Sequence, residues 1–133
     1  MANLIALDVG AKRIGVAAAD STVPIAMPLS TLEVDGTELD AIARLVAQRS
    51  AETIVIGYPR NQSGGVTDQT AFVQAFAAKL GGVATIVFQD ESLTSVMAEE
   101  RLKASGKPYS KADIDAFAAV IILQDYLETH HAA

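Results

Sequence analysis

The opening segment of the chain, residues 4–19, restricts the fold more than any other stretch. Its apolar and small residues predict two buried strands joined by a tight turn at Gly10–Arg13. Asp8 stands near the end of the otherwise apolar first strand. A carboxylate there has a high desolvation cost unless a cation or hydrogen bonds compensate it. We therefore expect Asp8 either to hydrogen-bond the turn backbone or to bind a divalent metal ion.

The rest of the chain alternates helical and extended patterns. A third strand is predicted over residues 25–32 and, because of its prolines, at a sheet edge. It completes an antiparallel meander over 4–33. Helices are predicted over 38–49, 67–80 and 111–129, strands over 53–56 and 83–88, and a loop over 57–65. A further helix, capped by Ser92 or Thr94, is predicted to run through about residue 104. This order predicts an α/β fold with a mixed five-stranded sheet, three antiparallel strands then two parallel ones, and helices on both faces.

Length and composition narrow the class of protein. The 133 residues suit a single domain, 1–133, and none of the apolar runs is long enough to span a bilayer. The absence of cysteine excludes disulfides and thiol chemistry, and we expect a cytoplasmic protein without a secretory signal. The net charge of −6 argues against non-specific binding of duplex DNA, although acidic residues that bind a metal ion can form a locally positive site.

Acidic residues follow two of the predicted strands. Asp8 and the pair Asp90-Glu91 lie at the carboxyl ends of strands, as does the 57–65 loop. Ligands of mixed and parallel sheets gather outside these ends. The residues alone do not decide whether Asp90 or Glu91 faces the site.

The last predicted helix contains two acids with different expected roles. Asp113 follows Ser110 by three residues, so a capping box accounts for it. Asp115 shares a helix face with Ala118, Ala119 and Ile122, and a carboxylate on such a face needs a partner. Asp115 is therefore the better candidate for a functional site.

Three carboxylates from a first strand, a later strand end and a helix start form a hard, oxygen-rich site. Mg²⁺ or Mn²⁺ suits such ligands and can support phosphodiester hydrolysis. Lys12 and Arg13 neighbour Asp8 at the hairpin turn, and Lys107 and Lys111 flank the expected entrance, so these four are candidates for binding the nucleic acid backbone.

Four motifs in order resemble one bacterial family. They are Asp8-Val9-Gly10-Ala11-Lys12-Arg13-Ile14-Gly15-Val16-Ala17; Ile56-Gly57-Tyr58-Pro59 with Asn61 and Gly64; Asp90-Glu91-Ser92-Leu93-Thr94-Ser95 with Ala98; and Ile114-Asp115-Ala116-Phe117-Ala118-Ala119 with Ile122-Leu123-Gln124. Together they resemble the pre-16S ribosomal RNA nucleases, also described as Holliday-junction-resolvase-like proteins.

The resemblance implies an RNase H-like fold and a metal-dependent endo- or exonuclease. It implies that Asp8, Glu91 and Asp115 are both the catalytic residues and the metal ligands, and that the biological role is 5′-end maturation of ribosomal RNA precursor. The loop residues Arg60, Asn61 and Gly64 join the expected substrate-binding set. The chain departs from the family at Ser92, where an arginine is usual.

Three alternatives remain beside this reading. One is a non-catalytic protein of RNA binding or ribosome assembly, and a second is a Holliday junction resolvase, which calls for a two-fold dimer. The third is a nucleotide-binding domain of the sugar-kinase type, which needs two such domains around a cleft and therefore a longer chain. We expect a monomer or weak homodimer that binds nucleic acid and no membrane.

Overall fold

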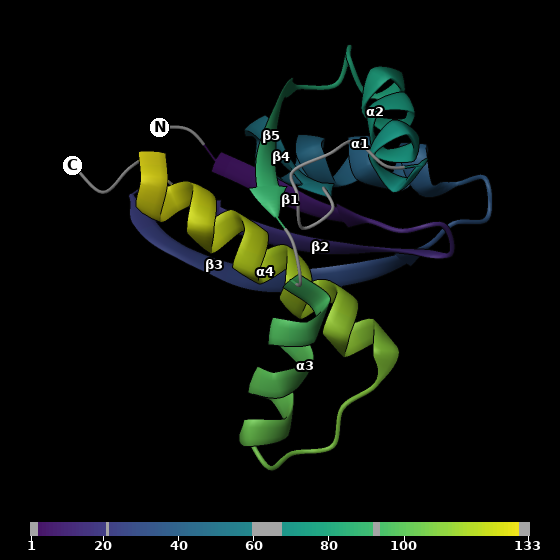
Figure 1. The fold of residues 1–133 in the computed structure, drawn as a ribbon. Helices are drawn as coiled ribbons and strands as arrows, with labels where there is room; N and C mark the ends of the chain where they lie inside the picture. The colour runs from purple at the N-terminus through teal and green to yellow at the C-terminus, as the bar shows by residue number, and fades with distance from the viewer. Residues whose placement is uncertain (1–2, 21, 60–67, 92–93, 131–133) are drawn as a thin grey trace.

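The computed structural model describes residues 3–20, 22–59, 68–91 and 94–130 (Figure 1). Five strands form one mixed sheet in the order β3-β2-β1-β4-β5. In chain order the elements are β1 (Asn3–Val9), β2 (Arg13–Asp20), β3 (Val23–Glu33), α1 (Glu38–Arg49), β4 (Ala51–Pro59), α2 (Asp68–Lys79), β5 (Thr85–Glu91), α3 (Thr94–Ala104) and α4 (Lys111–His130).

The predicted topology is confirmed. β1 pairs antiparallel with β2, and β2 pairs antiparallel with β3, so the first three strands form the meander. β4 is parallel to β1 and β5 is parallel to β4. The crossovers through helices place β4 and β5 beyond β1. The carboxyl ends of β1, β4 and β5 therefore share one edge of the sheet.

The boundaries of β3, β4 and β5 differ from those predicted. β4 continues through Gly57, Tyr58 and Pro59, which were expected to open a loop. The reason is that β5 itself continues to Glu91, and the parallel ladder pairs these last residues of both strands. The rings of Tyr58 and Phe88 also meet edge to face, with centroids 5.1 Å apart. At its other end β5 begins at Thr85 rather than at residue 83, and β3 begins at Val23 and so includes Pro24.

Helices cover both faces of the sheet, as predicted (Figure 1). On one face α1 and α2 pack on alternate strand residues, including Ile5, Leu7, Ile14, Val16, Ile54 and Ile56. On the other face α4 packs on the intervening residues, including Leu4, Ala6, Ala17, Ala19 and Val55. The small residues on this second face allow a helix to approach the sheet closely. We name it the α4 face.

α3 packs against α4 and extends away from the sheet (Figure 1). Buried Ala98 of α3 lies in one cluster with Ala118 and Ile121 of α4. The opposite side of α4 buries Ile122, Leu123 and Leu127 against the sheet. Within the described residues, no helix is long and apolar enough to cross a membrane.

The predicted capping box at the start of α4 is present. The Asp113 backbone N–H donates to Ser110 Oγ at 3.2 Å, and the Ser110 backbone N–H donates to Asp113 Oδ2 at 2.8 Å. Each side chain thus satisfies a backbone donor that the helix leaves unpaired. Capping accounts for Asp113 without any role in chemistry.

We expect Ser110→Ala to lower the free energy of unfolding by about 1 kcal/mol, because the cap loses its acceptor. Urea denaturation measures this change. Ser110→Thr, which keeps a hydroxyl oxygen at the cap, should retain most of the stability. Equal stabilities for the Ala and Thr variants would show that the hydroxyl does not stabilise α4.

Candidate metal and nucleic-acid site

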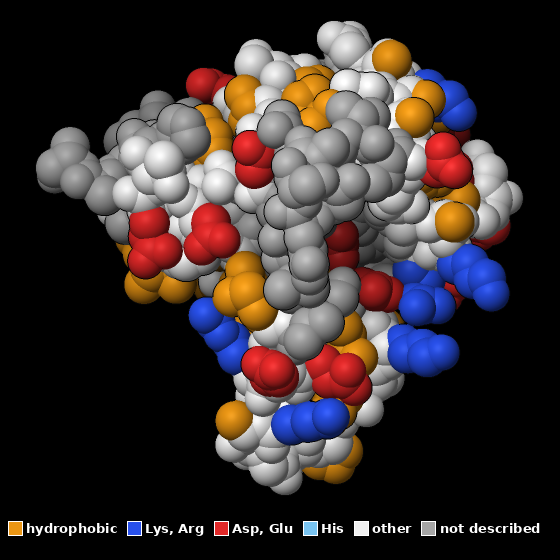
Figure 2. Space-filling view, in the orientation of Figure 1, with side chains coloured by type: hydrophobic (Ala, Val, Ile, Leu, Met, Phe, Trp, Pro, Cys, Tyr) orange, Lys and Arg blue, Asp and Glu red, His pale blue; other side chains and the backbone are white. Residues whose placement is uncertain are grey.

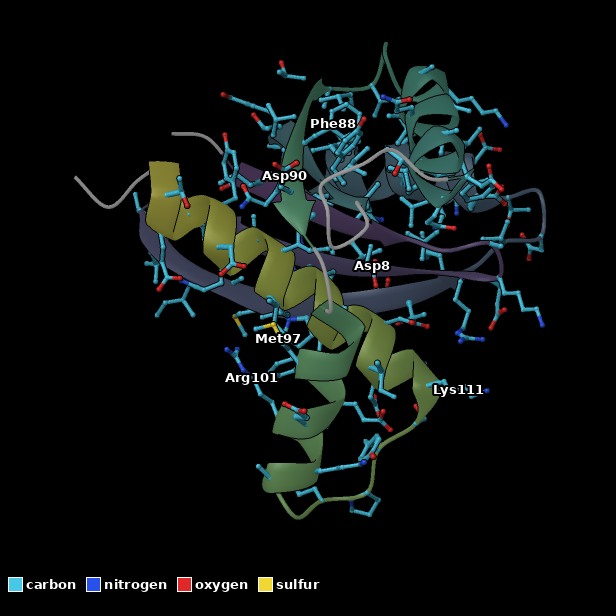
Figure 3. All side chains as sticks on the ribbon, viewed as in Figure 1. Asp8, Phe88, Asp90, Met97, Arg101 and Lys111 are labelled. Atoms are coloured by element: carbon cyan, nitrogen blue, oxygen red, sulfur yellow. The ribbon has the colours of Figure 1, made fainter. Side chains whose placement is uncertain are left out.

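Asp8 lies on the α4 face of the sheet, near the carboxyl end of β1. Successive strand residues alternate between faces, and Leu4 and Ala6 pack in the cluster under α4, so Asp8 shares their side. The residue is half-buried. In Figure 3 its carboxylate points toward the first half of α4.

Gly15 brings Asp8 and Asp115 to the same place. It is the cross-strand partner of Asp8 in the β1–β2 ladder. On the α4 face, a β-carbon at Gly15 would overlap the carbonyl oxygen of Asp115. Only glycine allows the helix backbone to approach the strand this closely. Asp8 and Asp115 are thus both immediate neighbours of Gly15, one through the ladder and one through helix packing.

Arg13 forms an ion pair with Asp115. Arg13 Nε donates to Asp115 Oδ2 at 2.6 Å, and the two side chains are 31% and 20% exposed. The hydrogen bond to Asp115, and then its negative charge, raise the pKa of the Arg13 guanidinium. Arg13 was predicted as a residue for the substrate backbone, but in this structure it binds a candidate catalytic acid. Strand parity places Arg13 on the same face as Gly15, but no local pattern in the sequence identifies Asp115 as its partner.

The Asp90-Glu91 pair ends β5. Asp90 is exposed and shares parity with Ile86, which packs on the side of α1 and α2. Figure 3 shows Asp90 near this end of β5. Asp90 thus faces away from α4. Glu91 is in register with Pro59 of β4, and its side chain lies outside the described residues.

Three predicted substrate-binding residues belong to the loop after β4. Arg60, Asn61 and Gly64 lie outside the described residues, so their expected contact with substrate stays a prediction. Residues on either side of that loop are placed. Its two ends join β4 and α2, and Gln69 of α2 donates through Nε2 to the Val9 carbonyl at the end of β1, at 3.1 Å. The described residues that flank the loop therefore lie next to the strand end that bears Asp8.

Exposed lysines lie in the β1–β2 turn, in the connection between α3 and α4, and at the start of α4. Lys12 in the β1–β2 turn and Lys111 at the start of α4 are exposed, as is Lys107 before α4. Figure 2 shows Lys and Arg side chains beside acidic ones where the β1–β2 turn and the start of α4 lie. Lys107 also lines a surface cavity of about 290 Å³ with Tyr109 and Phe117, among others. Tyr109 donates its hydroxyl to Glu99 Oε2 at 3.1 Å, a contact that sequence analysis missed.

The donor chemistry at Gly15 fits a hard cation. Asp8 and Asp115 are both neighbours of Gly15 and both partly accessible to water, and carboxylate oxygens are the ligands that Mg²⁺ and Mn²⁺ prefer. Among the side chains that the structure describes, no three acidic or histidine residues converge as a metal site, and that set does not include Glu91. The described part of the predicted triad is thus Asp8 and Asp115.

Comparison with known proteins gives concordant results. The model of one protein family, described as "RuvX: Holliday junction resolvase", matches residues 2–129. A protein of Chloroflexus aurantiacus named "Putative pre-16S rRNA nuclease" is 42% identical, over 97% of this chain and 88% of its own. A protein of the same name from Chloroflexus aggregans is 44% identical, over 95% and 93% of the two chains.

Solved structures with a similar fold are distant in sequence. Thermus thermophilus RuvC in complex with a Holliday junction superposes with a TM-score of 0.57 at 12% identity, over 97% of this chain and 96% of its own. The fowlpox virus resolvase, also with Holliday junction DNA, gives 0.55 at 10% identity over 94% and 98%. At such identities the likeness is one of fold. It confirms the expected RNase H-like, resolvase-type architecture.

Proposed function

The chain belongs to the RuvX family, and from this premise we propose that it is a nuclease that hydrolyses phosphodiester bonds with Mg²⁺ or Mn²⁺. The observation that carries the proposal is the meeting of Asp8 and Asp115 around Gly15 on the α4 face. This arrangement offers carboxylate oxygens, the ligands that Mg²⁺ and Mn²⁺ prefer, from two distant parts of the chain at one place.

Glu91 is the proposed third ligand. Val87 of β5 packs in the cluster under α4, and position 91 has the same strand parity as position 87. Position 90 has the opposite parity. The register of β5 therefore supports Glu91 over Asp90, in agreement with what the family resemblance implies.

We assign the following roles to the residues of the site. Asp8, Glu91 and Asp115 hold one or two divalent cations, which, when bound, activate water and stabilise the charge of the leaving oxygen. Lys12, Lys107 and Lys111 attract the phosphate backbone to this edge by their charge. Arg60, Asn61 and Gly64 are proposed to bind substrate from the loop after β4.

The proposed substrate is the precursor of 16S ribosomal RNA. Its support is the name shared by relatives that are 42% and 44% identical over almost the whole chain. We propose that residues 1–133 act as one domain in the cytoplasm, as a monomer or weak homodimer. Cleavage of four-way DNA junctions is a second candidate, favoured by the description of the family model.

A cleavage panel tests the function and its metal requirement. The purified chain is incubated with precursor 16S RNA, an unstructured RNA and a four-way DNA junction, in Mg²⁺ or Mn²⁺. We expect precursor RNA to be cut, and EDTA to reduce the rate to background because the acids alone do not activate water. Cutting of the junction alone would favour the resolvase, and cutting that survives EDTA would contradict the metal site. If no substrate is cut with either metal, a non-catalytic protein of RNA binding or ribosome assembly becomes the leading hypothesis.

A further inference from the structure

We propose that Arg13 is a built-in counter-ion that competes with the divalent cation for Asp115. In the metal-free protein Arg13 holds this carboxylate, and the cation binds only as Asp115 leaves the guanidinium. The inference rests on the proposed function, because it takes Asp115 as a cation ligand. Arg13 was predicted to bind the nucleic acid backbone, and control of cation binding is a different role at the same site.

The backbone on both sides places Arg13 and Asp115 next to each other. Arg13 opens β2, and its carbonyl accepts from the Gly10 N–H at 3.0 Å across the turn. Asp115 sits on α4 where the helix backbone touches Gly15. Thr31 Oγ1 of β3 donates to the Ala112 carbonyl at 2.7 Å, which fastens the first turn of α4 to the sheet. The pair is therefore aligned by the fold rather than by two freely rotating side chains.

The charges at the site explain why Arg13 and a cation exclude each other. Asp8 and Asp115 contribute two negative charges, and Arg13 contributes one positive charge, so the three together carry −1. A divalent ion that shares Asp115 with Arg13 also meets the repulsion of a guanidinium in contact with the same carboxylate, where burial limits screening by solvent. Removal of Arg13 from Asp115 restores the full negative charge for the ion.

Arg13 has a second acceptor when it leaves Asp115. Glu33 of β3 is its cross-strand partner, and its charge also raises the pKa of Arg13. Both Arg13 and Glu33 lie at the end of the sheet that carries the β1–β2 turn, and Glu33 is exposed. The guanidinium can thus exchange one carboxylate for another without becoming an unpaired charge.

A different role for Arg13 makes the opposite prediction. Groups that donate hydrogen bonds to a metal-binding carboxylate often orient it and increase metal affinity. If Arg13 orients Asp115 in this way, its removal weakens cation binding. If Arg13 competes, its removal strengthens cation binding. The sign of the change in affinity separates the two roles.

Binding of Mn²⁺ without nucleic acid, followed by the electron paramagnetic resonance of the free ion, measures this sign. We expect Arg13→Gln to lower the dissociation constant of Mn²⁺ at least about fivefold, a change of about 1 kcal/mol. Arg44→Gln is the matched control: it removes the same charge from the exposed surface of α1, on the other face of the sheet, and should change the constant less than about twofold. Arg13→Lys keeps the charge and should stay near the wild type.

Unchanged or weaker binding by Arg13→Gln overturns the proposal and leaves the metal site intact. Absence of Mn²⁺ binding in the wild type and in Arg13→Gln overturns the metal site itself. If Arg13→Gln does not fold, the proposal is tested on the wild-type protein by following the ¹H–¹⁵N resonance of the Arg13 side-chain N–H during a titration with Mg²⁺. We expect Mg²⁺ to shift this resonance as its bond to Asp115 Oδ2 breaks. A resonance that stays in place while Mg²⁺ saturates the protein contradicts the exchange.

Discussion

Asp8→Asn is expected to abolish metal-dependent cleavage while the protein remains folded. The loss should be at least about a hundredfold in rate, because loss of a residue that supports a metal ligand already costs about 10–100-fold and Asp8 is proposed as a direct ligand. Asparagine has the shape of aspartate but lacks its charge. The residue lies at the end of β1 on the α4 face, beside Gly15 rather than deep in the apolar layer.

The control for Asp8→Asn is Asp40→Asn. Asp40 is an exposed residue in the first turn of α1, on the opposite face of the sheet. This variant therefore changes the net charge by the same amount, at a position far from the site. Cleavage of precursor RNA in Mn²⁺, read with thermal unfolding of both variants, gives the comparison. Undiminished cleavage by a folded Asp8→Asn protein would refute the metal-site model.

The fold was predictable because its signals are local and agree with each other. The apolar run of residues 4–19, the turn at Gly10–Arg13 and the alternation of helical and extended segments specify a meander followed by parallel strands. The errors fall at strand ends. Tyr58 and Pro59 have the composition of a loop, yet they lie in β4 because pairing with β5 continues past the apolar run. Such pairing is a tertiary effect that no local pattern contains.

The candidate site was predictable in its acids and less so in its contacts. Asp8 stood out as a charge in an apolar strand, and Asp115 as a charge at the head of an apolar helix face. Two residues 102 positions apart, Arg13 and Asp115, leave no such local mark when they pair. The motif around Gly15 was visible only as a small residue in a strand. Glycine is needed at this position because the backbone of α4 passes close to it, and this contact can be seen only in the packed structure.

Gly15 is therefore the residue at which fold and site depend most directly on each other. Because a β-carbon at this position overlaps the Asp115 carbonyl oxygen, either α4 or β2 has to move to admit one. Neither can move freely: β2 is paired on both sides, and α4 buries Ala119, Ile122 and Leu123 against the sheet. Overpacking of a rigid contact typically costs about 1–3 kcal/mol, and occasionally more.

We expect Gly15→Ala to lower the free energy of unfolding by about 3 kcal/mol and to reduce Mn²⁺ affinity as well. Gly82→Ala is the matched control, since a β-carbon there has no heavy atom within 4 Å and the residue is exposed. Urea denaturation and Mn²⁺ binding of the folded fraction are compared for the two variants. If the Gly15→Ala protein is as stable as the Gly82→Ala protein, α4 can move to admit the β-carbon with no loss of free energy of unfolding. If Asp8 and Asp115 bind one ion, a displacement of the α4 backbone that moves Asp115 away from Asp8 should weaken Mn²⁺ binding. Loss of stability with unchanged Mn²⁺ affinity would therefore show that the close contact at Gly15 does not support the metal site.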